Sequence, residues 1–451
     1  MPQRTPVSDE QLARAQYQAD PLADDTIAAI LGPWPADLAV LGGDGALAAL
    51  EPQWERLRQV NLAIAGWQTN ADVAHWQAPV DLPAAIAQPL RRYLEAAHRL
   101  PDWADRAALA RAEAMFFDQG LLSVLLLFCA SLPECYVVPD LAEVLHTTGA
   151  LEQRTDYRIR STAAMIFPVM MSGGLTDPAA GGVAQVLKVR LIHATVRHLI
   201  LRGTPADAVL PGAAALAPLA LHGPAAGMHQ ALFAHGWNVP ERGLPSNQEE
   251  QAYTLLTFGY VPLRGMRSLG VPATPQQERD VLHAWNVVGH LVGIRDELMV
   301  ESMGEAQALF ERMQQRGRAE PRQPDHRGAL AGALFATLAQ VIPVAVLRPF
   351  PLLLCRRLIG PRSSADLRLD GQVGWLSTLL FALAMGLVRA IDTVGRWFSP
   401  GFSLARLISR LLGTQLITGL LMDQTRPLKL PEHLRAKTDQ MLRAWAAGGR
   451  A

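Results

Sequence analysis

The chain has 451 residues, 50% of them hydrophobic, so it has ample material for a folded core. Its 41 basic residues balance its 41 acidic residues, which gives no indication of a nucleic acid or another polyanion as partner. The three cysteines, Cys129, Cys135 and Cys355, form no CxxC pair and are too few for a disulfide framework. We therefore interpret them as buried small hydrophobic residues.

Targeting and membrane signals are weak. The N-terminal stretch up to Asp20 contains charges, prolines and no apolar run, so it does not resemble a signal peptide, and we expect a cytoplasmic protein. Residues 328–347 and 371–388 lack charged side chains and are long enough for a membrane-spanning helix. Because the first contains Gln340 and Pro343, we expect a soluble protein or peripheral membrane contact through these C-terminal helices rather than spanning.

Helical periodicity dominates the chain. No strand-like alternation persists anywhere, so we predict an all-α fold. We expect three regions: an N-terminal helical wrap in residues 1–100, a core in residues 101–320, and an apolar helical region in residues 321–451 that packs on the core.

The core region begins with two predicted helices, residues 105–118 and 119–132. The apolar run from Leu121 to Phe128 is interpreted as a buried helix or as the wall of a ligand cavity. A helix over residues 156–169 carries Arg158 and Thr162 on one face. Taken alone, this pair is more often a surface cation and a threonine bonded back to its own helix.

One histidine lies on an apolar stripe of the helix predicted over residues 182–202. Arg190 and Arg197 lie about one turn either side of this residue, His193. A lone histidine on a helix is more often a core or boundary residue than a ligand. A haem iron, however, needs a neutral imidazole in an apolar wall, and its propionates need nearby cations, so the stretch also fits a haem site.

The histidines that follow do not form a compact metal-ligand motif. They are separated by seven and six residues in a stretch with the composition of a loop: His222, His229 and His235.

Two further helices are predicted after this loop. Ser246 is expected to cap the first, over residues 249–260, with Glu249 three residues on. The second, over residues 276–303, starts after the Thr274-Pro275 pair. Within it, Gly289 and Gly293 would allow another helix or a flat ligand to approach closely.

Several sequence pieces occur together in a fixed order, mostly over residues 130–300, and a weaker one covers residues 349–360. The pieces are Thr148-Gly149, Arg158 with Thr162, Arg190 to Arg197, Pro245-Ser246-Asn247-Gln248, and Leu282 to Asn286 with Gly289 and Gly293. In this combination the chain resembles the latex clearing protein (rubber oxygenase) family, which includes the MpaB-type oxygenases.

The resemblance implies a haem b cofactor in an all-α, globin-like core with additional N- and C-terminal helices. It implies that His193 is the proximal iron ligand and that Arg190 and Arg197 are the arginines that flank it. The predicted core region, residues 101–320, would then be the haem-binding oxygenase core.

The resemblance also implies a set of distal, catalytic residues. Arg158 and Thr162 match distal-side positions, and a distal glutamate of the family falls near Glu143. Latex-cleaving members have a lysine immediately before the threonine, where this chain has Ser161, so rubber itself becomes a doubtful substrate.

The predicted function is a haem-dependent oxygenase that activates O2 to oxidise or cleave a hydrophobic, unsaturated substrate. The substrate would be a small isoprenoid- or lipid-like molecule or a polyprenyl chain. The first alternative is a haem-binding sensor or carrier with a second histidine ligand, for which His146, His283 and His290 are the candidates. The second alternative is a membrane-associated interaction protein without a cofactor.

Overall fold

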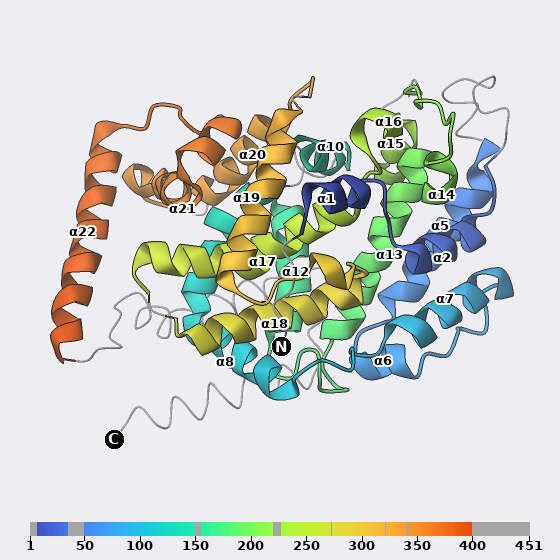
Figure 1. Cartoon of the computed structure of the whole chain (residues 1–451), viewed down its shortest axis with the longest axis horizontal. Coiled ribbons are helices and arrows are strands. Elements are labelled where there is room, and N and C mark those ends of the chain that lie inside the picture. Colours follow the sequence, from blue (N-terminus) through green and yellow to red (C-terminus); the bar gives the residue numbers. More distant parts are fainter. Residues whose placement is uncertain are drawn as a thin grey trace.

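The computed structural model describes residues 7–34, 49–148, 155–219, 227–271, 273–320, 322–340 and 342–398. These residues form helices and no β-strand, and the backbone has one isolated bridge, between Leu216 and Trp237. The all-α prediction is therefore confirmed (Figure 1).

The N-terminal helices precede the apolar helix that starts at Arg106. They are α1 (Asp9–Ala15), α2 (Pro21–Leu31), α5 (Glu51–Ala65), α6 (Asn70–Ala74) and α7 (Ala84–Ala97). The middle of the chain contains α8 (Arg106–Leu126), the π-helical turn η1 (Leu127–Ser131), α9 (Leu132–Cys135), α10 (Pro139–Thr147), α12 (Thr155–Met170), α13 (Gly182–Leu201), α14 (Pro205–Ala208), α15 (Met228–Ala234) and α16 (Val239–Arg242).

The last part of the described chain is also helical. It contains α17 (Gln248–Leu269), α18 (Pro275–Val292), the 3₁₀ turn η2 (Asp296–Leu298), α19 (Met303–Ala319), α20 (Arg327–Gln340), the 3₁₀ turn η3 (Ala345–Leu347), α21 (Phe350–Asp366) and α22 (Trp375–Phe398).

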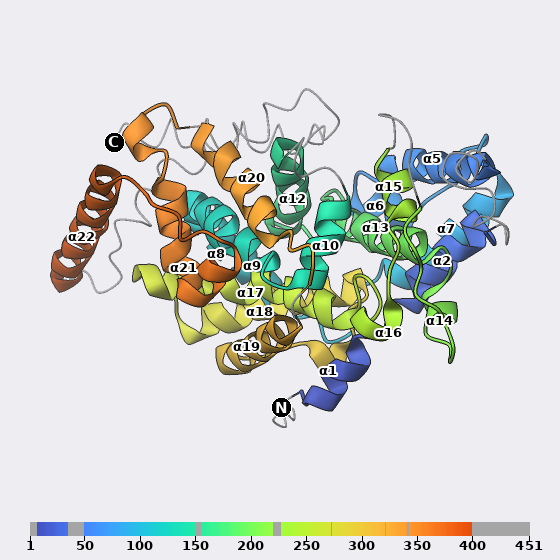
Figure 2. The ribbon, with the colours of Figure 1, turned by 90° about the horizontal axis from the view of Figure 1, so that it is seen from above.

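Helix α13 lies at the centre of the fold and carries His193. It starts after Gly181 and ends where Arg202 takes a left-handed conformation, with φ of 49°. Helices α2, α12, α15 and α18 make its most extensive contacts, and α6 and α14 also pack on it. In Figures 1 and 2, α2, α5, α6 and α7 lie together at one end of the molecule, the end toward which α13 also lies, whereas α1 lies apart from them and contacts α17. The fold therefore surrounds the predicted haem-binding helix on several sides.

The predicted break between residues 118 and 119 exists, but as a kink inside one element. Gly120 has non-helical torsions within α8, with φ of 31° and ψ of −103°, which an L-side chain would rarely adopt. The chain then continues through the π-helical turn η1 into α9. Such π-helical turns occur often at functional sites.

Three predicted helix boundaries need correction. Asn247, not Ser246, caps α17: its side chain accepts from the Glu250 amide, and Glu250 completes the capping box. The helix also runs through Pro262 to Leu269, well past residue 260. Helix α18 ends at Val292 rather than near residue 303, because Gly293 takes a left-handed φ of 92°.

The C-terminal apolar segments differ from each other. Residues 328–347 do not form one long helix, because α20 ends at Gln340 and a separate turn, η3, follows. Within the described part of the chain, two stretches of helix are long and apolar enough to cross a membrane: Arg106–Cys135, which is mostly buried, and Trp375–Gly395, of which few residues are buried. Both views show α22 at the edge of the molecule, beside α21 (Figures 1 and 2).

Candidate functional site

The side chain of His193 is half-buried and uncharged. Burial and the charge of Arg197 together lower its pKa to about 4, and Asp20 and Gln251 only partly oppose this shift. The Nδ1 atom is buried and makes no hydrogen bond of normal geometry, and the Oε1 atom of the neighbouring Gln251 is in the same state. A neutral imidazole is the form that binds iron.

One side of α13 is open, although the helix lies in the middle of the fold. The side chains on this open face are Gln185, Lys188, Val189, Ile192 and His193, and the other residues of the helix are buried. Ile192 is 46% exposed. Burial lowers the pKa of Lys188 to about 8, and this residue forms no ion pair within the described residues.

The open face provides two features that a haem requires of a protein. A haem needs one neutral imidazole and an apolar surface to lie against. His193 supplies the imidazole, with an unpartnered buried Nδ1, and Val189 and Ile192 supply apolar surface next to it. The residues that are present therefore fit the cofactor.

Arg190 and Arg197 point instead toward the N-terminal segment. Arg190 forms a buried bidentate pair with Asp20, with Nε–Oδ2 at 2.6 Å and Nη2–Oδ1 at 2.7 Å. Arg197 is fully buried, and its Nε donates to Asp24 Oδ1 at 2.8 Å. The Nη2 atom of Arg197 is buried without a partner. These contacts hold α13 against α2, and a propionate role for the two arginines stays a prediction.

The Pro245-Ser246-Asn247-Gln248 piece connects the chain around His193. Ser246 has a left-handed φ of 52°, and its carbonyl accepts from Arg197 Nη1 and Gln251 Nε2, both at 2.9 Å. Gln248 donates to the carbonyls of Ala19 and Gly293. The piece therefore positions Gln251, the side chain beside His193.

Helix α12 packs against α13 and carries the predicted distal pair. Thr162 is half-buried, and it shares a face with Ile166 and Met170 at four-residue spacing. Arg158 belongs to the same stripe by its position, but its side chain, like that of Ser161, lies outside the described residues. Whether the two distal residues approach His193 stays a prediction.

An apolar cavity of about 60 Å³ continues from this face of α12. Its walls come from α8, η1, α12, α17 and α18, and they include Leu126, Leu127, Ile166, Met170, Phe258 and Trp285. The rings of Phe258 and Trp285 stack with centroids 5.5 Å apart. Two buried polar atoms at this cavity, Gln119 Oε1 and Ser131 Oγ, have no hydrogen-bond partner. The cavity thus uses part of the predicted 121–128 wall.

Glu143 lies between two histidines. Its Oε1 atom is 3.1 Å from His235 Nε2, and its Oε2 atom is 3.4 Å from His326 Nε2. Burial favours a higher pKa for Glu143, but the hydrogen bond from His235 and the charge of His326 lower the pKa overall. Helix α20, which follows His326, contacts both α10 and α12. No contact within the described residues joins Glu143 to His193 or Thr162.

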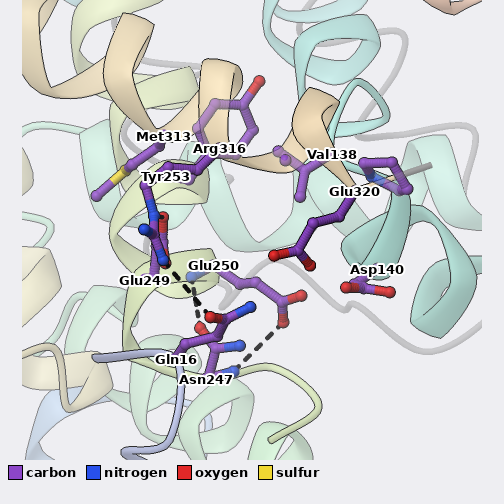
Figure 3. Close-up of a pocket in the computed structure, with 12 residues that line it drawn as sticks. Gln16, Val138, Asp140, Asn247, Glu249, Glu250, Tyr253, Met313, Arg316 and Glu320 are labelled. Atoms are coloured by element: carbon purple, nitrogen blue, oxygen red, sulfur yellow. Dashed lines mark hydrogen bonds and ion pairs between the residues drawn. The ribbon is translucent and has the colours of Figure 1, made fainter. Parts of the chain in front are cut away.

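A second pocket, between α10, α17 and α19, has a different character (Figure 3). Figure 3 shows the carboxylates of Asp140, Glu250 and Glu320 gathered on one side, while Arg316 bonds Glu249 at 2.8 Å. Burial, together with the charge of Asp140, raises the pKa of Glu250 to about 8. A pocket lined with this many carboxyl groups is poorly suited to a hydrophobic substrate.

The family description that matches the chain is "ER-bound oxygenase mpaB/B'/Rubber oxygenase, catalytic domain", and the match covers residues 106–390. This span is more than half of the chain and contains α8, α12, α13, α17 and α18. The chain belongs to this family.

Individual relatives agree with the assignment. The rubber oxygenase of Streptomyces sp. (strain K30) is 24% identical over 270 residues, which cover 59% of this chain and 55% of the relative. The match thus spans about half the length of that relative. A solved structure of latex clearing protein in the closed state superposes with a TM-score of 0.57 at 19% identity, over 95% of this chain and 90% of that one. This likeness shows a shared fold.

The rubber oxygenase and mpaB family match begins at Arg106, after the acidic residues that hold α13. Asp20 and Asp24 lie outside the matched region, yet they bind Arg190 and Arg197 inside it. Gln251 and Lys188 were also missed by the sequence reasoning. Lys188 could have been noticed because helical spacing places it on the same side of the helix as Val189 and Ile192. No local sequence pattern indicates Gln251.

The other histidines considered as a second ligand each contact other side chains, and both His283 and His290 pack on Trp103. His146 stacks on His326 with ring centroids 3.6 Å apart. His283 Nε2 accepts from the Asp105 amide at 2.9 Å, so that nitrogen is already used. His290 Nδ1 lies 3.6 Å from Asp296 Oδ1. These placements give no support to a sensor with two histidine ligands.

Proposed function

We propose that this protein is a haem b-dependent oxygenase that oxidises or cleaves a hydrophobic, unsaturated substrate. The observation that carries the proposal is the neutral imidazole of His193, with a buried Nδ1 that has no hydrogen-bond partner, beside Val189 and Ile192 on the open face of α13. When bound, the haem would supply an iron centre that binds and activates dioxygen.

His193 would hold the iron, and Gln251 would orient its ring. Metal-binding histidines commonly donate their second ring nitrogen to an acceptor. Gln251 Oε1 is a buried acceptor without a partner, next to His193, whose Nδ1 is a buried nitrogen without a partner. With the proton on Nδ1, the pair would satisfy both atoms and leave Nε2 for the iron.

The distal side would be built on α12 and α10. Thr162 and Arg158 offer hydrogen-bond donors that would orient dioxygen, with the charge of the arginine strengthening its bond. Glu143, kept ionised by His235 and His326, would accept a proton at its carboxylate. In this assignment the two histidines are positioning residues for Glu143.

The apolar cavity would receive the reacting part of the substrate. Its wall includes Ile166 and Met170, one and two turns along α12 from Thr162, so it adjoins the distal side. The rubber oxygenase relative suggests an unsaturated chain as substrate class. Ser161, which stands where the latex-cleaving members have a lysine, favours a polyprenyl or unsaturated lipid over rubber itself. Gln119 and Ser131 would contact a polar end or a water molecule.

Substrate-dependent oxygen uptake tests the proposed activity. The purified protein is mixed with polyprenyl and unsaturated lipid substrates, oxygen consumption is recorded, and cleavage products are identified by mass spectrometry. We expect uptake with at least one unsaturated substrate and none with its saturated analogue. Haem-loaded protein that consumes no oxygen across the panel would contradict the oxygenase proposal and favour a carrier or sensor.

A further inference from the structure

Helix α22 exposes an apolar stripe along its whole length. The stripe residues are between 36% and 80% exposed and comprise Trp375, Leu376, Leu379, Leu383, Leu387, Ile391, Val394 and Trp397. At 3.6 residues per turn, they lie within an arc of about 160°. They therefore form one continuous apolar surface. Single exposed leucines elsewhere on the protein are scattered and form no such surface.

The stripe faces away from the rest of the molecule. On the opposite side of α22, the Phe381 ring packs edge-to-face on Phe350 of α21, with ring centroids 5.5 Å apart. Ser377 and Asp392, which also belong to that side, are buried. Both views place α22 at the outer edge of the molecule (Figures 1 and 2). No described residue covers the stripe.

The ends of the stripe carry the residue type that prefers a membrane interface. Trp375 is 76% exposed and Trp397 is 80% exposed, and the two are about 33 Å apart along the helix. Tryptophan concentrates at the boundary between headgroups and acyl chains. If α22 instead paired with a second copy of itself as a coiled coil, only a narrow row of apolar residues would be needed, and the stripe on α22 is broader than that.

Two arginines beside α22 have no acidic partner among the described residues. Arg357 of α21 has a buried Nε atom without a hydrogen bond. The pKa of Arg357 is lowered by burial and by the charge of Arg389, which is exposed on α22. Two neighbouring cations that pair with no carboxylate of the described chain are complementary to an anion such as a lipid phosphate.

We propose that α22 docks the protein on the surface of a membrane that contains anionic phospholipids. The stripe enters the boundary between headgroups and acyl chains, and the helix lies in the plane of the membrane. Arg357 and Arg389 bind headgroup phosphates. This docking does not depend on the haem or on the proposed oxygenase activity.

Vesicle flotation of the full-length protein tests the docking. Vesicles of phosphatidylcholine are compared with vesicles of phosphatidylcholine and phosphatidylglycerol in equimolar amounts. We expect stronger binding to the anionic vesicles and about tenfold or greater weakening in the double variant Leu383→Asp with Leu387→Asp, because two inserted leucines become charged. The matched control is Leu62→Asp with Leu210→Asp, two leucines exposed elsewhere, which should bind as the wild type does.

The arginines are tested by the double variant Arg357→Gln with Arg389→Gln. It should lose most of the preference for anionic vesicles and keep binding to phosphatidylcholine. Circular dichroism confirms that each variant remains folded. The proposal is overturned if the wild type does not float with either vesicle, or if the Leu383 and Leu387 variant binds as the wild type does. A third result would also overturn it: the wild type forms a dimer and does not bind vesicles, and the Leu383 and Leu387 variant is a monomer. The stripe would then be a dimer interface.

Discussion

The carboxyl group of Glu250 lies inside the protein and is protonated near neutral pH. Burial raises its pKa to about 8, from 4.5 when exposed, and the charge of Asp140 adds to this effect. In the unfolded chain the same group ionises near its ordinary pKa. Between these two pH values the folded state therefore binds more protons than the unfolded state, and folding stability must fall as the pH rises.

The variant Glu250→Gln should remove this pH dependence while keeping the capping box, because glutamine can also accept from Asn247. Thermal unfolding from pH 4.5 to pH 8 should show the wild type losing a few kcal/mol relative to the variant. Glu95→Gln, at an exposed helical position, should follow the wild type. Parallel curves for the wild type and Glu250→Gln would contradict the raised pKa.

The buried ion pair between Asp20 and Arg190 anchors the His193 helix. Removing one partner of such a pair leaves an uncompensated buried charge. We expect Asp20→Ala to reduce the free energy of unfolding by about 3 kcal/mol or more, measured in urea. Glu10→Ala, which breaks the exposed pair with Arg14, should change it by less than about 0.5 kcal/mol. Equal effects of the two substitutions would show that the Asp20 pair is not structurally important.

The sequence allowed some of these roles to be predicted and not others. His193 could be singled out because periodicity places it on an apolar stripe of one helix and because the family resemblance matches it to the proximal ligand. The partner of Arg190 could not, because Asp20 lies 170 positions away and ion pairs across the fold leave no local pattern. The expectation that Arg190 flanks the haem stays a prediction, and the structure adds that its guanidinium binds the Asp20 carboxylate.

Two glycines determine how α18 ends and how closely it packs against α17. At the C-terminal end of α18, Gly293 has a φ of 92°, and a Cβ added there would lie 2.5 Å from Asp20 Oδ2 and 2.8 Å from Arg190 Nε. In α18 itself, a Cβ on Gly289 would meet Leu255 of α17 at 2.7 Å. The close approach predicted for these glycines is thus made by protein groups in this structure.

The variant Gly293→Ala should destabilise the protein by about 2 kcal/mol or more, since the left-handed backbone and the crowding of the ion pair act together. Gly304→Ala is the matched control, because its Cβ would meet nothing within 4 Å and alanine favours the helix. It should raise stability by about 0.5 kcal/mol. Thermal unfolding measures both, and a neutral Gly293→Ala would contradict the proposed crowding.

Helix boundaries were predictable where a local residue determines them and not elsewhere. The Thr274-Pro275 start of α18 was correct, since threonine caps the helix and proline occupies its first turn. The cap of α17 is predicted one residue early, because Ser246 and Asn247 are both good caps. The sequence also offered no reason for α17 to continue through Pro262, which tertiary packing against α8 and α18 permits.

The whole molecule brings together surfaces that no single segment encodes. The apolar cavity draws its wall from five elements, and the open face of α13 arises because its neighbours cover the other sides. The sequence could indicate the all-α class and the central helix. It could not indicate Gln251 beside His193, since that contact depends on where the first turn of α17 lies relative to α13.

Haem retention tests the central claim most directly. His193→Ala is compared with His198→Ala, a matched control on the same helix whose ring nitrogens are also buried without partners and whose pKa burial lowers to about 4. The wild type purified with haem should show a Soret band. His193→Ala should lose the band with its helicity unchanged, and His198→Ala should keep it. A Soret band at wild-type stoichiometry in His193→Ala would contradict the assignment.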